Sequence, residues 1–64
     1  MKVKLFRFEL FENGKSRFVD WYRNETKEMA LECALEDCHR YGIPAGFTHE
    51  IREATKNEYA TLED

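Results

Sequence analysis

The Asn13-Gly14 pair and the segments beside it constrain the fold more than any other feature of this 64-residue chain. The stretch reads "LFRFELFENGKSRFVDW", and large apolar side chains alternate with polar ones on both sides of the pair. Asn and Gly readily adopt the positive φ angles that both central residues of a type I′ turn require. The pattern therefore predicts a β-hairpin over residues 2–23.

A two-residue loop at Asn13-Gly14 also predicts which hairpin residues lie opposite each other. In that register Phe8 faces Val19 and Phe6 faces Trp21, so large apolar side chains meet across the strands. Successive side chains of a strand point to opposite sides, so the hairpin has two different faces. One face is expected to carry Phe6, Phe8, Leu10, Val19 and Trp21. The other is expected to carry Leu5, Arg7, Phe11, Phe18, Asp20 and Tyr22.

The next stretch, "NETKEMALECALEDCHRYG", predicts a helix over residues 25–41. Asn24 is a suitable N-cap, and Gly42 can adopt the left-handed conformation that ends many helices. Apolar residues spaced three and four apart form a stripe, which we expect to cover the Phe6 face of the hairpin. The stripe consists of Ala30, Leu31, Ala34, Leu35, Cys38 and Tyr41.

Gly42, Pro44 and Gly46 stand close together after this helix. Pro44 prevents the helix from continuing, and Gly46 lets the chain turn back. Phe47 would then begin a third strand over about residues 47–55. For residues 56–64 we expect a C-terminal tail or a short extra element. The longer segment "EIREATKNEYATLE" is rich in helix formers, and its residues Ile51, Thr55, Tyr59 and Leu62 fit one helical face, so a second helix over that segment is the alternative.

Together these elements predict one small α+β domain over residues 1–64. It contains a three-stranded antiparallel sheet with one helix packed on one face, in the order β-β-α-β. A chain of this length buries only about 60% of the surface that it exposes when unfolded. There is therefore little room for an enclosed active site.

No stretch of the chain shows a pattern that catalysis or cofactor binding needs. There is no Gly-rich phosphate loop, no paired CxxC motif and no nucleophile elbow. Cys33 and Cys38 are five residues apart in the expected helix, so they point in different directions and suit neither a disulfide nor a shared metal site. We interpret His49 as a structural residue of the third strand. The expectation is a protein that is not an enzyme and has no catalytic residues, cofactor or metal.

The sequence also lacks the signals that direct a chain into or across a membrane. No run approaches the roughly 20 apolar residues of a membrane-spanning helix. The N-terminus "MKVKLFRFEL" lacks the apolar stretch and cleavage site of a signal peptide. We expect a cytoplasmic protein, which means the host cytoplasm if the protein is encoded by a phage.

Charge is divided unequally along the chain. Residues 1–24 contain six basic and three acidic side chains, whereas residues 25–64 contain four basic and ten acidic ones. Such an asymmetry bears on the choice of partner rather than on the fold.

Three glutamates of the expected helix, Glu28, Glu32 and Glu36, repeat every four residues and therefore lie on one side of it. Like charges at this spacing repel and cost helix stability. With the neighbouring Met29 they predict a contact surface for a protein that carries a basic surface. The remaining contact candidates are Arg52, Phe18 and Tyr22.

The helix and the corner after it resemble a known family. The segment "KEMALECALEDCHRYGIPAGFTHEIRE" joins an acidic helix rich in alanine and leucine to Pro44-Ala45-Gly46-Phe47 and a polar strand. It is similar to the small inhibitor of host RNA polymerase made by T-odd podophages. The similarity covers roughly residues 24–53.

The resemblance implies a β-sheet covered by one helix, which binds bacterial RNA polymerase near the downstream DNA channel and obstructs a productive promoter complex. In that family the contact relies on arginines that alternate on the strand after the corner, aided by a negative strip elsewhere. The corresponding positions here are Ile51 and Glu53, and Arg52 points to the opposite face of the strand. Glu28, Glu32 and Glu36 could stand in for the negative strip. The implied function is an inhibitor or modulator of host RNA polymerase or of another host nucleic-acid-handling complex.

Other interpretations stay open. An anti-restriction or anti-CRISPR inhibitor would show the same physical features. Leu5, Phe18 and Tyr22 could join two copies into a homodimer through the open sheet face. The hairpin could instead bind nucleic acid, because it mixes basic and aromatic side chains. These are Lys4, Arg7, Arg17 and Arg23 with Phe11, Phe18 and Tyr22.

Overall fold

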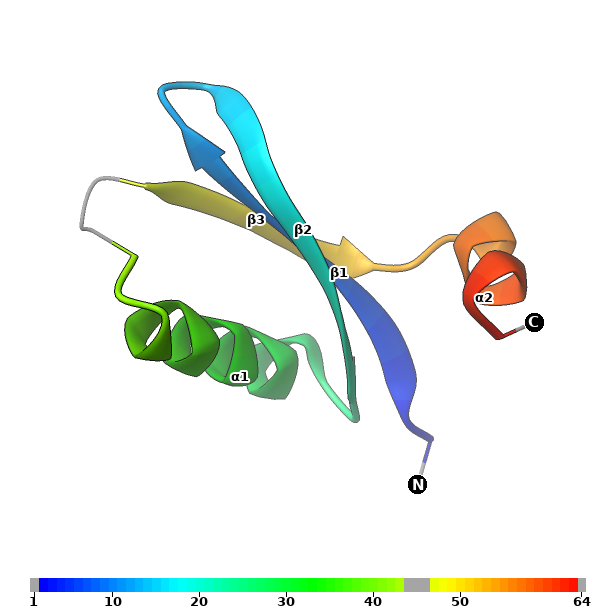
Figure 1. The fold of residues 1–64 in the computed structure, drawn as a ribbon. Helices are drawn as coiled ribbons and strands as arrows, with labels where there is room; N and C mark the ends of the chain where they lie inside the picture. Colours follow the sequence, from blue (N-terminus) through cyan, green and yellow to red (C-terminus); the bar gives the residue numbers. More distant parts are fainter. Residues whose placement is uncertain (1, 44–46, 64) are drawn as a thin grey trace.

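The structure, a computed structural model, describes residues 2–43 and 47–63. They form a three-stranded antiparallel sheet in the order β2-β1-β3, with α1 crossing one face and α2 lying beyond the end of β3 (Figure 1). The α+β architecture with one helix on one sheet face is thereby confirmed. The elements are β1 (Lys4–Glu12), β2 (Lys15–Asn24), α1 (Lys27–Arg40), β3 (Thr48–Glu53) and α2 (Lys56–Glu63).

The predicted hairpin turn is confirmed. Asn13 and Gly14 both have positive φ angles, 52° and 78°, and Glu12 pairs with Lys15 beside them. The positive angles at both central positions are those of a type I′ turn, whose twist matches the twist of the flanking strands.

The register beyond the turn differs from the expected one. A bulge lies between Leu10 and Phe11, so Phe11 pairs with Ser16 whereas Leu10 pairs with Phe18. The extra residue on β2 is Arg17, and from there on every partner is displaced by one. The pairing of Phe8 with Val19 and of Phe6 with Trp21 is therefore wrong.

This displacement exchanges the two faces of β2. Phe6 pairs with Tyr22 and Phe8 pairs with Asp20, so Tyr22 lies on the same sheet face as the buried β1 residues. Phe18 also joins that face, whereas Val19 and Trp21 turn to the opposite one. The expected second apolar face built on Phe18 and Tyr22 is not formed.

The core lies between α1 and the sheet. Phe8 is fully buried at its centre, and its ring makes edge-to-face contacts with Tyr22 and Phe18 at centroid distances of 6.2 and 6.5 Å. Ala30 and Ala34 are also fully buried, because small side chains let the helix backbone come close to the strands. Partly buried residues packed on this cluster are Phe18, Tyr22, Leu31, Cys38, Ile43, Phe47 and Ile51.

The apolar stripe of the helix is narrower than expected. Leu35 and Tyr41 were assigned to it, but both are exposed. A sheet of three strands covers only part of the circumference of a helix, so the outermost positions of the stripe extend beyond it.

The two ends of α1 are closed by different means. The N-cap is Thr26 rather than Asn24, since β2 runs on to Asn24 and the Thr26 hydroxyl accepts a hydrogen bond from the Met29 amide at 3.2 Å. At the other end Gly42 has a φ of 72°, as expected for the residue that terminates a helix. The Ile43 amide donates to the Cys38 carbonyl at 3.0 Å, which completes a Schellman motif and brings Ile43 into the core. Pro44 and Gly46 lie outside the described residues.

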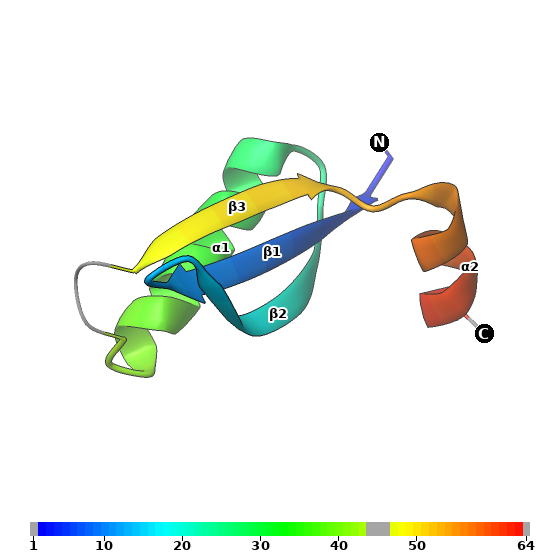
Figure 2. The same ribbon diagram turned by 90° about the horizontal axis from the view of Figure 1, so that it is seen from above.

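Of the two forms expected for residues 56–64, a tail or a short extra element, the structure shows the second, since Lys56–Glu63 form the helix α2. Thr55 and Glu58 form a reciprocal capping box, in which the Glu58 carboxylate accepts from the Thr55 amide at 2.8 Å and the Thr55 hydroxyl accepts from the Glu58 amide at 3.3 Å. The Tyr59 hydroxyl accepts a hydrogen bond from the Leu5 amide at 2.7 Å, where β3 has already ended. These bonds fix α2 beside the start of β1, away from α1 (Figure 2).

Candidate functional site

Glu28, Glu32 and Glu36, which we call the acidic strip, lie on the outer face of α1 and are all exposed. Their orientation follows from the core, because Ala30 and Ala34 fix the opposite side of the helix against the sheet. The strip is therefore presented to solvent along successive turns of α1, as its spacing predicted.

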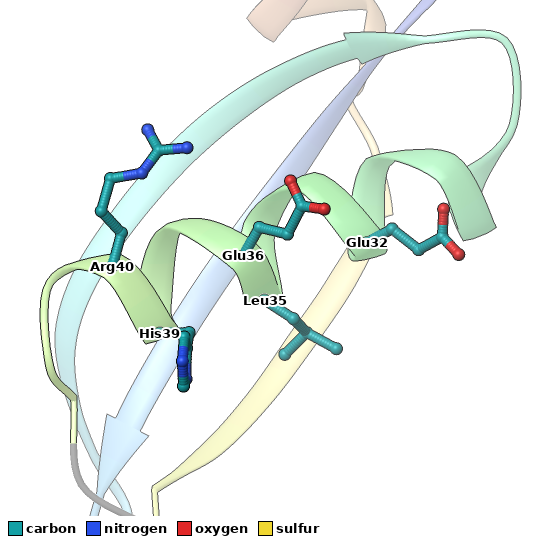
Figure 3. Close-up of a pocket in the computed structure, with 5 residues that line it drawn as sticks. All are labelled: Glu32, Leu35, Glu36, His39 and Arg40. Atoms are coloured by element: carbon teal, nitrogen blue, oxygen red, sulfur yellow. The ribbon is translucent and has the colours of Figure 1, made fainter.

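Two exposed apolar side chains border the acidic strip. Met29 is 45% exposed and Leu35 is 44% exposed. Figure 3 shows Glu32, Leu35, Glu36, His39 and Arg40 around a shallow pocket on α1, with Leu35 and His39 on the flank nearer to β3. Because a single helix supplies all of these side chains, the surface suits a protein contact better than an enclosed small molecule.

The charges of the acidic strip are not neutralised within the described part of the chain. None of its carboxylates forms an ion pair there, and Arg40, four residues after Glu36, lies 3.7 Å from Asp37. Asp37 also accepts a hydrogen bond from the Tyr22 hydroxyl at 2.9 Å. Burial and this bond to Asp37 raise the pKa of Tyr22. The carboxylate of Asp37, on the flank of α1 facing β2, is thus hydrogen-bonded to the sheet, whereas the carboxylates of the acidic strip are not.

The sheet face opposite α1 carries a charge network built from Arg7, Glu9, Arg52 and Glu58. Arg52 donates to both carboxylate oxygens of Glu58, at 2.8 and 3.1 Å, and Arg7 donates to Glu9 at 2.6 Å. The Nε of Arg7 lies 3.9 Å from Glu58, which links the two pairs. The Arg52 bonds, with those from Thr55, lower the pKa of Glu58 to about 2. Hydrogen bonds from Ser16 and Arg7 lower the pKa of Glu9.

The structure separates the contact candidates that the sequence suggested. The acidic strip and Met29 lie together on α1, whereas Arg52 belongs to the charge network on the other face. Phe18 and Tyr22 pack on the core, so the interpretation of both as open-face contacts is wrong. The expected dimer face fails for the same reason, and its third member, Leu5, is only 2% exposed.

The basic and aromatic residues of the hairpin do not form one surface. Arg17 is paired with Glu12 at 2.7 Å and Arg7 with Glu9, so both cations already have acidic partners. The expected aromatic companions, Phe18 and Tyr22, face α1 instead of solvent. Of the three aromatic side chains expected beside the basic residues, Phe11 alone lies on the sheet face opposite α1.

Within residues 2–43 and 47–63, His, Cys, Asp and Glu side chains form no group of three that could bind a metal. Cys33 and Cys38 are free thiols, both partly buried. Burial raises the pKa of Cys38, and the neighbouring Asp37 adds to the effect, so this thiol is held in its protonated form. Among the described segments, no helix is long and apolar enough to cross a bilayer.

Two residues of these surfaces were not identified from the sequence. Glu58 could have been found, because Thr55-x-x-Glu58 is a capping-box pattern that predicts a helix start. The exposure of Leu35 had no such signal, since its spacing fits the apolar stripe as well as that of Leu31 does.

Within the segment from which a polymerase inhibitor was inferred, Lys27–Arg40 form α1 and Thr48–Glu53 form β3. Ile51 and Glu53 pair with Phe8 and Phe6 and so share the sheet face that α1 covers, while Arg52 pairs with Arg7 on the opposite face. A comparison of the chain with protein-family models, curated proteins and solved structures finds no match.

Proposed function

We propose that the chain is a non-enzymatic protein-binding domain, an inhibitor or modulator that docks through the outer face of α1 onto a basic protein surface. The observation that carries this proposal is the combination, in one place, of exposed Met29 and Leu35 with an acidic strip that forms no ion pair among the described residues. Apolar contact supplies affinity when it is buried, and the surrounding carboxylates select a partner of opposite charge.

Repulsion within the acidic strip favours the same assignment. Each pair of glutamates four residues apart costs a free helix a few tenths of a kcal/mol. Lysine or arginine side chains of a partner would remove this cost, so α1 gains stability when it docks. The carboxylates would also accelerate the encounter, and salt would weaken that acceleration.

The resemblance of residues 24–53 makes bacterial RNA polymerase the first partner to test. The proposed action is steric: a bound domain would block a nucleic-acid channel or a protein contact of the polymerase, or of another nucleic-acid-handling complex of the host. A phage protein with this action would work in the host cytoplasm. The basic anchor of the similar family is missing here, so the acidic strip would carry the contact.

The test is the binding of purified bacterial RNA polymerase to the immobilised chain, measured as association and dissociation rates at low and high salt. Glu36→Lys is expected to lower the association rate about tenfold at low salt, since a charge at a contact surface acts mainly on the encounter. The difference between wild type and variant should shrink as salt is added.

Glu12→Lys is the matched control. It makes the same change in net charge at the hairpin end, where Glu12 pairs with Arg17 rather than facing outward from α1. Equal slowing by both variants would mean that net charge, and not the acidic strip, governs the encounter. Wild type could fail to bind the polymerase but capture another protein. If Glu36→Lys then loses that protein and Glu12→Lys keeps it, the docking surface is supported and the proposed partner is wrong.

A further inference from the structure

The two edges of the sheet differ in how they are protected. β2 and β3 are the outer strands, and exposed strand edges carry backbone groups that can pair with another chain. On β2 the Asp20 carboxylate accepts a hydrogen bond from the Trp21 amide at 2.8 Å, and the bulge at Arg17 interrupts the strand. The bulge and this bond make the β2 edge a less regular template for pairing.

The hydrogen bonds of Leu5 reveal which backbone groups of β3 point outward. The Leu5 carbonyl accepts from the Ala54 amide at 2.8 Å and its amide donates to Tyr59, so the polar groups of Leu5 face the β3 side. Polar groups alternate along a strand, so those of Arg7 and Glu9 face β3 as well. Their partners are Arg52 and Glu50. The outward groups of β3 then belong to His49, Ile51 and Glu53.

These outward groups are largely unused. In the described segments the bond that reaches them comes from the Arg52 guanidinium, which donates to the Glu53 carbonyl at 3.2 Å. A carbonyl oxygen can accept a second hydrogen bond. The β3 edge thus offers donors and acceptors that residues 2–43 and 47–63 do not satisfy.

We propose that two copies of this chain pair through their β3 edges, antiparallel, with Ile51 opposite Ile51 on a two-fold axis. Both Ile51 residues point their amide and carbonyl groups outward, so they can exchange a pair of backbone hydrogen bonds. The two three-stranded sheets would become one continuous sheet of six strands.

The side chains of β3 are self-complementary in this register. Glu50 lies opposite Arg52 of the second copy, twice, and His49 lies opposite Glu53 of the second copy, twice. Opposite charges across antiparallel strands are stabilising, and like charges are destabilising. Arg52 is already held by Glu58 through two of its nitrogens, and its remaining N–H groups can reach a second carboxylate.

Other registers lack this match. Only shifts of two residues keep outward backbone groups opposite each other. One such shift places Glu50 against Glu50, and the opposite shift places Arg52 against Arg52. The sequence of β3 therefore selects the register centred on Ile51.

The exposure of Leu35 is consistent with the same contact. A two-fold axis through the β3 edges, perpendicular to the sheet, puts both α1 helices on one sheet face. Leu35 projects from the flank of α1 nearer to β3 (Figure 3), so the two Leu35 side chains would approach the contact from opposite sides. Pairing would then cover an apolar side chain that the monomer leaves in water.

The test uses charge exchange at two positions, measured by sedimentation velocity over a concentration series. Wild type should dimerise, and Glu50→Arg should weaken the dimer at least about tenfold, because both Glu–Arg pairs become Arg–Arg pairs. Arg52→Glu should do the same by creating Glu–Glu pairs. An equimolar mixture of the two variants should dimerise again, since each Arg then meets a Glu.

Circular dichroism of each variant shows whether the fold is kept, and Glu12→Arg at the hairpin end should dimerise like wild type. Amide hydrogen exchange gives a second readout: the Ile51 amide should become protected as concentration rises. A wild type that stays monomeric, or variants that dimerise as tightly as wild type, would overturn the proposal. Polymerase binding of the same variants is measured separately, since the acidic strip and Met29 are unchanged in them.

Discussion

Among the described residues, charged side chains form ion pairs with one another on the sheet face opposite α1, whereas the carboxylates on the outer face of α1 do not. Opposite α1, the network around Arg52 and Glu58 is joined by short hydrogen bonds and holds α2 to the sheet. On the outer face of α1 the acidic strip is left unpaired within the described residues. Charge is thus used for folding on one face and costs stability on the other, which is why we assign the contact surface to α1.

The largest expected effect tests whether the outer face of α1 is free of packing. Ala34→Leu adds volume to a site with no exposed surface, and overpacking should cost about 1–3 kcal/mol of the free energy of unfolding. Glu32→Leu introduces the same side chain two residues away on the outer face, where the change should stay within about 0.5 kcal/mol. Urea unfolding of both variants gives the comparison. Similar losses in the two would show that the acidic strip is packed against something.

The next largest effect tests the charge network through the pH dependence of the free energy of unfolding. The pKa of Glu58 is lowered on folding to about 2, against an unfolded value of about 4.3. Its carboxylate therefore stabilises the fold above the unfolded pKa, and this contribution is lost as pH falls toward 2. Thermal melts should show Glu58→Gln losing less stability than wild type between about pH 4.5 and pH 2. Parallel curves for the two proteins would contradict the assigned bonds.

The smallest expected effect is a gain in the free energy of unfolding rather than a loss. Glu32→Lys replaces two repulsive pairs, with Glu28 and Glu36, by two attractive ones, and should raise the free energy of unfolding by about 0.3–1 kcal/mol. The same variant should bind a basic partner more weakly. A variant that is more stable and binds less would sharpen the contrast between the two faces, whereas loss of stability would show that Glu32 has a structural role.

Local chemistry made the turn and the helix end predictable. Asn13-Gly14 and Gly42 each occupy a positive-φ position that few other residues accept, so the sequence marks them directly. The acidic strip was predictable for a similar reason, because its spacing and the alanines opposite it define the two sides of one helix.

The bulge and its consequences could not be read in the same way. Residues 18–22 place large apolar side chains at both odd and even positions, Phe18 and Tyr22 against Val19 and Trp21. Either register therefore gives an apolar inner face, and periodicity alone does not choose between them. For residues 56–63 the sequence left a tail, a short extra element and a helix open, because the helix start signal at Thr55 adjoins a segment that also fits a strand.

The bonds between Leu5 and the region of Ala54 and Tyr59 have a consequence for biosynthesis. They join residues as many as 54 positions apart, and they lie on the side of β1 that faces β3. A ribosome releases β1 before its second neighbour in the sheet, β3. The nascent β1 must then wait with half of its hydrogen-bonding capacity open until β3 emerges, and slow synthesis of the segment between them would prolong its exposure to chaperones or to other unpaired strands.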